Sequence, residues 1–382
     1  MRLGDDEKRM LDGAKGPHVA RALDFIVSFG DAFGAEKLVD IQYVHYPAEM
    51  AIYRGSVEEA CEYAEGGPKV CVPTTSSTLA CDLDRPGHRG LPAGLYELQA
   101  RIVAAHKAMG VLGTYTCTPQ FNGFVPPKGA NIVSVESSAI VWFNSILGAR
   151  TNRGGFLTRY SAVCGKYPLM GYLLDENRRG THLFRLDLTA DDMCNSVDFS
   201  ALGFHIGAIT GSGVPVIDGL PPARSYDLLA LGAALATSGS VTLFHAPPYT
   251  AEAVSVEAAS GDRMPESEHL VTRADLDAVK AKLTNIGAGQ PIDFVTLGCP
   301  HYTLAELWEL SVRLAARGGR VADGVEFQVC TNRFIRDAAR QLGILEPIER
   351  AGAVVLVDSC PVESHMRIST CNEWGLKVPQ VE

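Results

Sequence analysis

Asp293-Phe294-Val295-Thr296-Leu297-Gly298-Cys299-Pro300-His301 is a short apolar run that ends in a glycine, a cysteine and a proline. An apolar run of this length, bounded by turn residues, is typical of a buried strand. Thr303 then precedes Glu306 by three residues, a spacing that fits a capping box and predicts a helix over residues 304–316. A strand followed directly by a helix is the repeating unit of folds built on a parallel sheet.

The same alternation of apolar runs and helical patterns extends along the rest of the chain. Further strands are predicted at residues 69–72, 110–116, 324–329 and 353–357, and helices at residues 16–30, 95–108, 226–237, 273–283 and 333–342. We therefore predict an α/β fold of mostly parallel sheets in α/β/α layers.

The length of the chain predicts more than one hydrophobic core. A single core seldom grows beyond about 250–300 residues, and this chain has 382. The polar segment 251–270, rich in small residues, is predicted to connect an N-terminal region, 1–250, with a C-terminal α/β lobe, 271–382. A second break is predicted near residues 181–200, so several lobes are expected around a central cleft.

Composition and charge exclude several classes of protein. The chain is 46% hydrophobic, and 44 acidic against 34 basic residues give a formal net charge of −10. Such a balance argues against a general nucleic-acid binder, which needs a basic face. The most apolar window, residues 228–246, is interrupted by polar residues and predicts a buried helix followed by a strand, with no membrane span. The N-terminal residues carry no secretory signal, so a cytoplasmic location is predicted.

Three of the ten cysteines share one pattern: Cys117, Cys299 and Cys360 each follow a predicted strand and lie beside a proline. Because proline cannot continue a central strand, each cysteine is placed at a carboxyl strand end, where open α/β sheets bind ligands. Three thiolates converging from separate strands would suit an iron–sulfur cluster with one iron free of protein sulfur. Three buried cysteines at turns would give the same pattern, and sequence spacing leaves both interpretations open.

A second signal is a dense polar run at residues 144–153. It contains Arg150 and Arg153, and arginine binds carboxylate or phosphate through two parallel hydrogen bonds. A solvated turn with two surface arginines is the alternative. The hydroxyl-rich residues 72–78 are predicted either to bind a substrate or to cap a helix. The glycine-rich residues 207–213 lack the spacing of a phosphate loop, which excludes a nucleotide site.

Taken together, these segments resemble the large subunit of aconitase X, a divergent branch of the aconitase superfamily. The matching residues are 114–119, 136–138, 144–153, 165–166, 218–221, 231–234, 238–239, 298–301 and 358–362. The resemblance implies an aconitase-like fold, a hydro-lyase activity and an iron–sulfur cluster held by Cys117, Cys299 and Cys360. The cluster type is left open among 2Fe-2S, 3Fe-4S and 4Fe-4S, and a mononuclear iron site on the same cysteines is an alternative.

On this basis we predict the remaining site residues. Ser137, Asn144 and His301 are predicted as catalytic residues. The predicted substrate-binding residues are Thr74, Ser76, Glu136, Ser138, Arg150, Thr151, Asn152, Arg153 and Lys166. In the expected reaction the substrate's carboxylate or phosphate lies against the two arginines, its hydroxyl leaves with Lewis-acid assistance, and a base removes a proton from the neighbouring carbon.

The resemblance implies two candidate substrates, cis-3-hydroxy-L-proline and mevalonate 5-phosphate. We predict the first, with Δ1-pyrroline-2-carboxylate as product, because the Ala-, Gly- and Arg-rich, acidic chain is typical of bacterial proteins. Family members combine a large part with a small swivelling domain that closes the active site. Nothing in this chain resembles that domain, so the chain is predicted to be the large subunit of a heterodimer. A non-catalytic scaffold subunit that binds the partner and a metabolite is the alternative from another class.

The chain departs from the family pattern at two places. Family members usually carry a tyrosine after Cys-Thr-Pro, where this chain has Gln120. The family also continues well beyond the third cysteine, whereas this sequence stops at Glu382, soon after Cys371. A shortened C-terminal lobe is therefore predicted.

Overall fold

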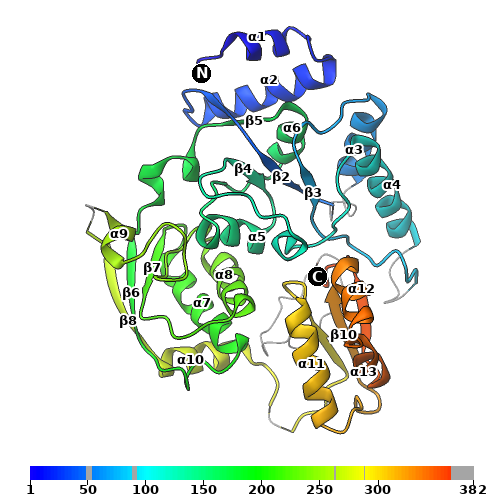
Figure 1. Cartoon of the computed structure of the whole chain (residues 1–382), viewed down its shortest axis with the longest axis vertical. Helices are drawn as coiled ribbons and strands as arrows, with labels where there is room; N and C mark the ends of the chain where they lie inside the picture. The colour runs from blue at the N-terminus through cyan, green and yellow to red at the C-terminus, as the bar shows by residue number, and fades with distance from the viewer. Residues whose placement is uncertain (49–53, 88–92, 262–263, 288, 363–382) are drawn as a thin grey trace.

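The computed structural model describes residues 1–48, 54–87, 93–261, 264–287 and 289–362. In this part of the chain the strands form three parallel sheets of three strands each and one antiparallel pair (Figure 1). The predicted α/β fold with mostly parallel sheets is confirmed. The end of the predicted C-terminal lobe, residues 363–382 with Cys371, lies outside the described residues.

The first sheet forms the centre of the N-terminal part. Its strand order is β3-β2-β4, and Leu112 adds a parallel bridge beside Thr75 of β3. Helices α2 and α6 pack on one side of the sheet, and α3 and α4 lie together on the other (Figure 1). The elements of this part are α1 (Asp5–Leu11), α2 (Pro17–Ala32), β1 (Leu38–Asp40), β2 (Tyr43–Tyr46), α3 (Arg54–Glu65), β3 (Thr74–Ser76), α4 (Ala93–Met109), β4 (Ile132–Ser134), α6 (Leu157–Cys164) and β5 (Lys166–Pro168).

The second sheet has the order β7-β6-β8 and is covered by α7 and α8. These two helices approach so closely that a Cβ on Gly239 would lie 2.0 Å from the carbonyl oxygen of Gly207. Gly207, in the glycine-rich run, therefore serves helix packing. The elements are β6 (His182–Asp187), α7 (Ser196–Thr210), β7 (Pro215–Asp218), α8 (Ser225–Gly239), α9 (Val256–Ser260), β8 (Ser267–Thr272) and α10 (Arg273–Leu283).

The third sheet, of order β11-β10-β9, packs with three helices around Leu307, Val329 and Ile348. Its first helix begins as predicted, because Thr303 Oγ1 accepts from the amide of Glu306 at 3.3 Å while the Glu306 carboxylate accepts from the amide of Thr303 at 2.8 Å. The elements are β9 (Phe294–Leu297), α11 (Leu304–Ala316), β10 (Glu326–Thr331), α12 (Arg333–Gln341), α13 (Leu345–Arg350) and β11 (Val354–Val357).

Short helical segments fill the space between the sheets, with α5 near the middle of the molecule (Figure 1). They are η3 (Pro119–Asn122), α5 (Ser137–Val141), the π-helical turn η4 (Trp142–Ile146), η5 (Gly171–Leu173) and η6 (Asp175–Arg178). The π-helical turn carries Asn144, and such turns interrupt the regular helix ladder where side chains are redirected.

Three strand predictions are wrong. The strand expected at residues 69–72 lies instead at Thr74–Ser76, directly after Pro73, whose nitrogen cannot donate to a ladder. The middle of the predicted hydroxyl-rich loop 72–78 is thus a strand. The strand expected at residues 110–116 is reduced to the single bridge at Leu112, and the one expected after the helix in residues 228–246 to a single bridge at His245. Residues 267–270, which were assigned to a connection, form the first part of β8.

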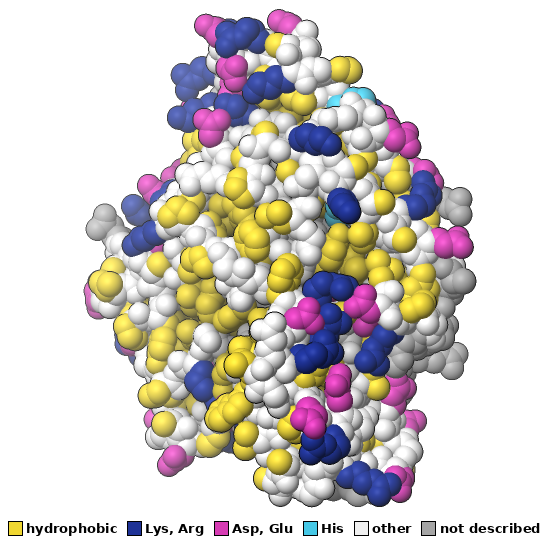
Figure 2. Space-filling view, turned by 45° about the vertical axis from the view of Figure 1, so that its right-hand side comes forward, with side chains coloured by type: hydrophobic (Ala, Val, Ile, Leu, Met, Phe, Trp, Pro, Cys, Tyr) yellow, Lys and Arg dark blue, Asp and Glu magenta, His cyan; other side chains and the backbone are white. Residues whose placement is uncertain are grey.

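The described surface carries mixed charge. Figure 2 shows Lys and Arg side chains next to Asp and Glu side chains over this face, with no extended basic area among the described residues drawn there. No helix in the described ranges is long and apolar enough to cross a membrane.

Candidate functional site

Loops at the carboxyl ends of the first and third sheets meet between the two sheets. The loop after Leu112 carries Cys117, the loop after β9 carries Cys299, and the loop after β11 carries Cys360. A parallel bridge between Leu79 and Ser359 joins the loop after β3 to the Cys360 loop. We call the three cysteine loops together the cysteine junction. Carboxyl strand ends are where open parallel sheets place their ligands.

Cys117 lies at the middle of the cysteine junction and is buried. The backbone amide of His301, two residues after Cys299, donates to its sulfur at 3.2 Å. Burial raises the pKa of the Cys117 thiol well above its ordinary value. The charges of Glu136 and Cys360 raise it further, while the His301 amide and Ser138 lower it. Residues from all three loops therefore act on one sulfur atom.

His301 ties the three loops together. Its Nδ1 lies 3.2 Å from Thr116 Oγ1 and its Nε2 lies 3.0 Å from the carbonyl oxygen of Ser359. Since a carbonyl only accepts, Nε2 carries the proton and Nδ1 accepts from the threonine. Burial lowers the pKa of His301 to about 4, and the Ser359 carbonyl opposes this effect. The ring is therefore neutral at pH 7 and acts as a bridge between loops.

Three cysteine thiolates are the donor chemistry of an iron–sulfur cluster. Among the described residues, no group of three or more His, Cys, Asp or Glu side chains is placed to hold a metal ion. Cys299 and Cys360 are both partly exposed and Cys117 is buried. Solvent therefore reaches two of the three predicted ligands.

A polar cluster adjoins Cys117 at the start of α5. Ser138 Oγ donates to the Cys117 carbonyl oxygen at 2.9 Å. The Glu136 carboxylate accepts from Ser77 Oγ at 2.9 Å and from the Ser137 amide at 3.1 Å. Arg153 Nη1 donates to Ser137 Oγ at 2.9 Å. Burial lowers the pKa of Arg153, and the charge of Glu136 opposes this effect. The structure therefore brings the predicted residues 136–138 and Arg153 together beside the cysteines.

Other predicted residues have partners elsewhere. Arg150 pairs with Asp175 and donates to the carbonyl oxygen of Leu173 at 3.0 Å. Lys166 pairs with Asp40 at 2.8 Å, next to α1. Both carboxylate partners lie outside the cysteine junction, and the assignment of Arg150 and Lys166 to substrate binding stays a prediction.

Asn144, Thr151 and Asn152 use their side chains inside the fold. Asn144 is fully buried, donates to the carbonyl oxygens of Thr151 and Thr242, both at 2.9 Å, and accepts from the Thr151 amide at 3.1 Å. Thr151 Oγ1 accepts from the Ser134 amide at 3.2 Å, and Asn152 donates to the Met170 carbonyl oxygen at 3.0 Å. These bonds fix the shape of the loop that presents Arg153.

Thr74 and Ser76 are buried in β3. Thr74 Oγ1 donates to the Val72 carbonyl oxygen at 2.9 Å, and Ser76 Oγ donates to the Leu112 carbonyl oxygen at 3.2 Å. The Ser76 hydroxyl therefore holds β3 to the chain that leads to Cys117, whereas the Thr74 hydroxyl bonds within its own segment. Ser77, the next residue, reaches Glu136.

The sequence predicted no site role for three neighbours of the cysteine junction, Asn332, Thr116 and Gln120. Asn332 follows β10 and donates to Thr116 Oγ1 at 3.3 Å. Thr116 Oγ1 donates to His301 Nδ1 and accepts from Asn332, and Thr118 Oγ1 lies 3.1 Å from it. Gln120 is buried, and its two amide atoms have no partner among the described residues. A polar residue directly after a strand was the available signal for Asn332.

A cavity of about 130 Å³ is lined by Glu59 and Arg159 together with Val135, Gly155 and Phe156, which lie within three positions of Glu136 or Arg153 in the sequence. The polar cluster beside Cys117 can itself bind a small polar molecule, because it combines a carboxylate, hydroxyls and a cation.

Comparison with known proteins gives matches along nearly the whole chain. The first, second and third domains of aconitase X match residues 1–176, 180–281 and 292–373. The crystal structure of Thermococcus kodakaraensis aconitase X in its holo-form superposes with a TM-score of 0.84 at 31% identity, covering 95% of this chain and 89% of that chain.

Relatives carry dehydratase names. The phosphomevalonate dehydratase large subunit of Methanothermobacter thermautotrophicus is 37% identical over 94% of this chain and 88% of its own length. The cis-3-hydroxy-L-proline dehydratase of Pseudomonas aeruginosa is 33% identical over 94% of this chain, which spans only 62% of that relative.

The fold and the site thus define a hydro-lyase of the dehydratase class. The chain belongs to the aconitase X family.

Proposed function

We propose that this chain is the large subunit of a dehydratase that converts cis-3-hydroxy-L-proline to Δ1-pyrroline-2-carboxylate. The observation that carries the proposal is the meeting of the three cysteine loops around Cys117, through the His301 amide and the charge of Cys360, beside Glu136 and Arg153. A Lewis-acid cofactor, a carboxylate and a cation in one place are the groups that water elimination from a hydroxy acid requires.

Cys117, Cys299 and Cys360 would hold an iron–sulfur cluster. The cluster would supply the Lewis acid that weakens the bond between carbon and the departing hydroxyl. Because thiols must lose their protons to bind metal, the His301 amide, which donates to the Cys117 sulfur, favours the thiolate there.

The residues of the polar cluster would orient the substrate and move its proton. Arg153 would hold the carboxylate of the amino acid, because a guanidinium donates two parallel hydrogen bonds to a carboxylate. Glu136, itself held by Ser77 and the Ser137 amide, lies where it would receive the α-proton. Loss of that proton and of the 3-hydroxyl as water gives an enamine, which tautomerises to the cyclic imine.

Charge favours hydroxyproline over a phosphorylated substrate. Within the polar cluster, Arg153 is the cation that the described contacts place beside Glu136, whereas Arg150 and Lys166 have carboxylate partners elsewhere. A substrate with both phosphate and carboxylate groups calls for more cations than one.

Mevalonate 5-phosphate is the second candidate substrate. The observation that favours it is the 37% identity to a phosphomevalonate dehydratase large subunit, which exceeds the 33% identity to a hydroxyproline dehydratase. Because several relatives are named large subunits and the hydroxyproline dehydratases are longer than this chain, we propose a small swivelling subunit as partner in either case.

Anaerobic reconstitution with a small subunit tests the proposal. The two proteins, supplied with iron and sulfide, are assayed with each substrate, and iron and sulfide are counted per chain. Dehydration of hydroxyproline supports the proposal, and turnover of mevalonate 5-phosphate alone replaces it with the second candidate. A complex that carries a full cluster and turns over neither compound contradicts both. A colourless complex that binds no iron indicates a scaffold subunit.

A further inference from the structure

The turn that carries Cys360 has an unusual backbone. Asp358 has a φ of 62°, in the left-handed region, although it is not a glycine. Such a backbone persists only when its surroundings hold it, and it recurs at functional sites. The amide of Asp358 donates to the carbonyl oxygen of Thr331 at 2.8 Å, and the amide of Cys360 donates to that of Leu79 at 2.9 Å. The peptide bonds on both sides of the turn are therefore fixed.

One arginine fixes the side chain of the same turn. The Asp358 carboxylate is only 2% exposed, and it accepts from the Arg333 amide at 2.8 Å and from Arg333 Nε at 2.7 Å. Because a buried carboxylate needs a positive partner, Arg333 determines whether the carboxylate can stay in this position.

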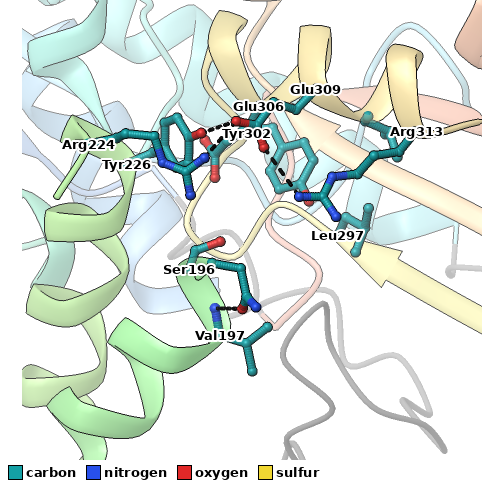
Figure 3. A pocket seen from close by; sticks show the side chains of 11 residues that line it. Ser196, Val197, Arg224, Tyr226, Leu297, Tyr302, Glu306, Glu309 and Arg313 are labelled. Carbon is teal, nitrogen blue, oxygen red and sulfur yellow. Dashed lines mark hydrogen bonds and ion pairs between the residues drawn. The ribbon is translucent and has the colours of Figure 1, made fainter. Parts of the chain in front are cut away.

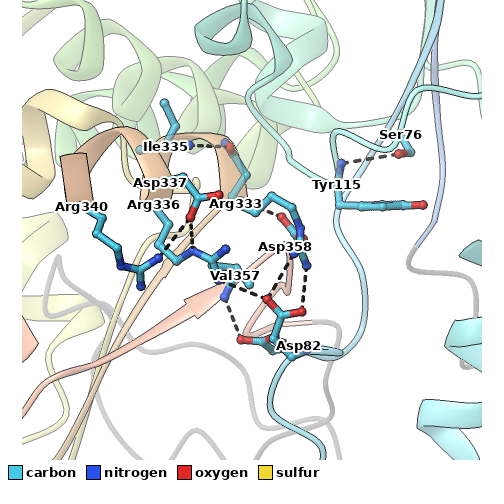
Figure 4. A network of polar contacts seen from close by, with 12 residues as sticks. Ser76, Asp82, Tyr115, Arg333, Ile335, Arg336, Asp337, Arg340, Val357 and Asp358 are labelled. Carbon is cyan, nitrogen blue, oxygen red and sulfur yellow. Dashed lines mark hydrogen bonds and ion pairs between the residues drawn. The ribbon is translucent and has the colours of Figure 1, made fainter. Parts of the chain in front are cut away.

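The same guanidinium reaches across to the first sheet. Its two terminal nitrogens donate to the two carboxylate oxygens of Asp84, each at 3.2 Å. Figure 4 shows Arg333 beside Asp358 in this network, with Asp82 and Val357 next to them. Asp82 accepts from the amide of Val357 at 3.0 Å and from the amide of Asp84 at 2.9 Å. Arg333 therefore clamps the Cys360 turn of the third sheet to the loop that follows β3 in the first.

We propose that Arg333 is a positioning residue for Cys360, which it holds at the cysteine junction through Asp358 and Asp84. Lysine cannot replace it fully, because its single ammonium group cannot span two carboxylates as a planar guanidinium does. The importance of Cys360 for catalysis rests on the proposed function, but its position does not. The two can therefore be tested separately.

Alkylation of individual cysteines tests this proposal without relying on activity. The full-length chain is stripped of iron, kept reduced and treated with iodoacetamide, and the rate at each cysteine is read by peptide mass spectrometry. In Arg333→Met we expect Cys360 to react at least about fivefold faster than in the wild type, because its turn opens locally. Arg333→Lys should give a smaller increase, and Asp84→Asn should raise the Cys360 rate through loss of the contact to the first sheet.

Arg340→Met is the matched control. Arg340 lies on the same helix and pairs with Asp337 on the exposed side, at 3.2 Å. It should leave the Cys360 rate unchanged. Buried Cys164, in α6, reports global loosening, because it reacts only when the fold opens. An unchanged Cys360 rate in Arg333→Met and Asp84→Asn overturns the proposal, and so does a parallel rise at Cys164. If Arg333→Met does not fold, Arg333→Lys and Asp84→Asn decide by the same criterion.

Iron binding gives a second readout. After reconstitution, iron per chain should fall in Arg333→Met and stay at the wild-type level in Arg340→Met. Equal iron in both variants, with unchanged alkylation, contradicts the positioning role. A wild-type chain that binds no iron contradicts the proposed function, while the alkylation rates still decide on the role of Arg333.

Discussion

At the scale of single residues, the surroundings of Cys117 are formed by residues that lie far from it in the sequence. Its sulfur receives the amide of a residue 184 positions away, and its backbone carbonyl receives Ser138. Burial and neighbouring charges keep the free thiol protonated, because both raise its pKa. A metal bound here, as proposed, would therefore compete with a proton for the sulfur.

Replacement of Cys117 or Cys360 by serine should reduce bound iron per chain to less than half of the wild-type value, because a hydroxyl is a poor ligand for iron in a cluster. Iron and acid-labile sulfide are measured after anaerobic purification. Cys194→Ser is the control, since Cys194 is exposed and lies just before α7, the helix that covers the second sheet. Full iron content in both cysteine variants at the junction would show that the cluster lies elsewhere.

Glu136→Gln should lower kcat by about 100-fold or more, because an amide cannot receive the substrate proton. The variant should fold normally, since the amide oxygen can still accept from the Ser137 amide while the amide NH2 donates to Ser77 Oγ in place of the lost acceptor. Steady-state rates are measured on the reconstituted heterodimer. Glu257→Gln is the control, because Glu257 lies at an exposed position on α9. A variant with normal kcat would remove Glu136 from the proton transfer.

At the scale of elements, the turn between β9 and α11 decides how close Cys299 comes to the third sheet. Gly298 has a φ of 99°, and a Cβ there would lie 2.0 Å from the carbonyl oxygen of Cys330. That atom belongs to the backbone of β10 and cannot move aside as a flexible side chain would. Only glycine therefore allows the Cys299 loop to cross over the neighbouring strand.

Gly298→Ala should cost about 3 kcal/mol of unfolding free energy, since strain and a backbone collision add. It should also lower iron binding. Gly318→Ala is a matched control: Gly318 has a φ of 92° with no atom within 4 Å of its Cβ position, so only backbone strain of about 1 kcal/mol applies. Urea unfolding measures both. Equal costs for the two variants would contradict the collision.

At the scale of the whole molecule, polar contacts join the second sheet and its helices to the third sheet and its helices. These contacts surround a cavity of about 350 Å³ (Figure 3). Arg224, at the start of α8, pairs with Glu309 of α11 at 2.8 Å, and Tyr226 also contacts Glu309. Glu306 lines the same cavity, and burial raises its pKa to about 7. Thr303 opposes this effect, and Asp227 and Glu309 add to it. The carboxylates of Asp227, Glu306 and Glu309 thus act on one another where α8 of the second sheet meets α11 of the third.

Glu306 should make the stability of the molecule depend on pH. Its pKa is higher in the folded than in the unfolded state, so the folded state binds the proton more tightly. The resulting stabilisation is full below the ordinary pKa of a glutamate and is lost as pH rises through about 7. Glu306→Gln should therefore remain more stable than the wild type at about pH 8, on the order of 2 kcal/mol, with the difference vanishing near about pH 4.

Urea unfolding at several pH values measures this dependence. Glutamine preserves the bonds with Thr303, because it can complete a capping box as glutamate does. Glu349→Gln, at an exposed position on α13, is the control and should follow the wild-type pH profile. Identical profiles for Glu306→Gln and the wild type would show that this carboxyl titrates normally.

The local sequence determined the kinds of element and what stands at their ends. Thr303 and Glu306 predicted the start of α11, and the strands before Cys299 and Cys360 lie where the apolar runs placed them. These features depend on residues a few positions apart, so their physical causes are visible in a short window. Pro73 shows the limit, because it shifted β3 beyond the predicted range.

Only the tertiary structure decided which strand ends meet. Arg150 and Arg153 look alike in the sequence, yet Arg150 pairs with Asp175 while Arg153 reaches Ser137 beside the cysteines. The role of Arg333, joined to Asp84 across 249 positions, carries no local signal. Residues so far apart in the sequence come into contact because of how the sheets pack against one another. The burial of apolar faces sets the distances between the loops of the sheets, and no short motif does so.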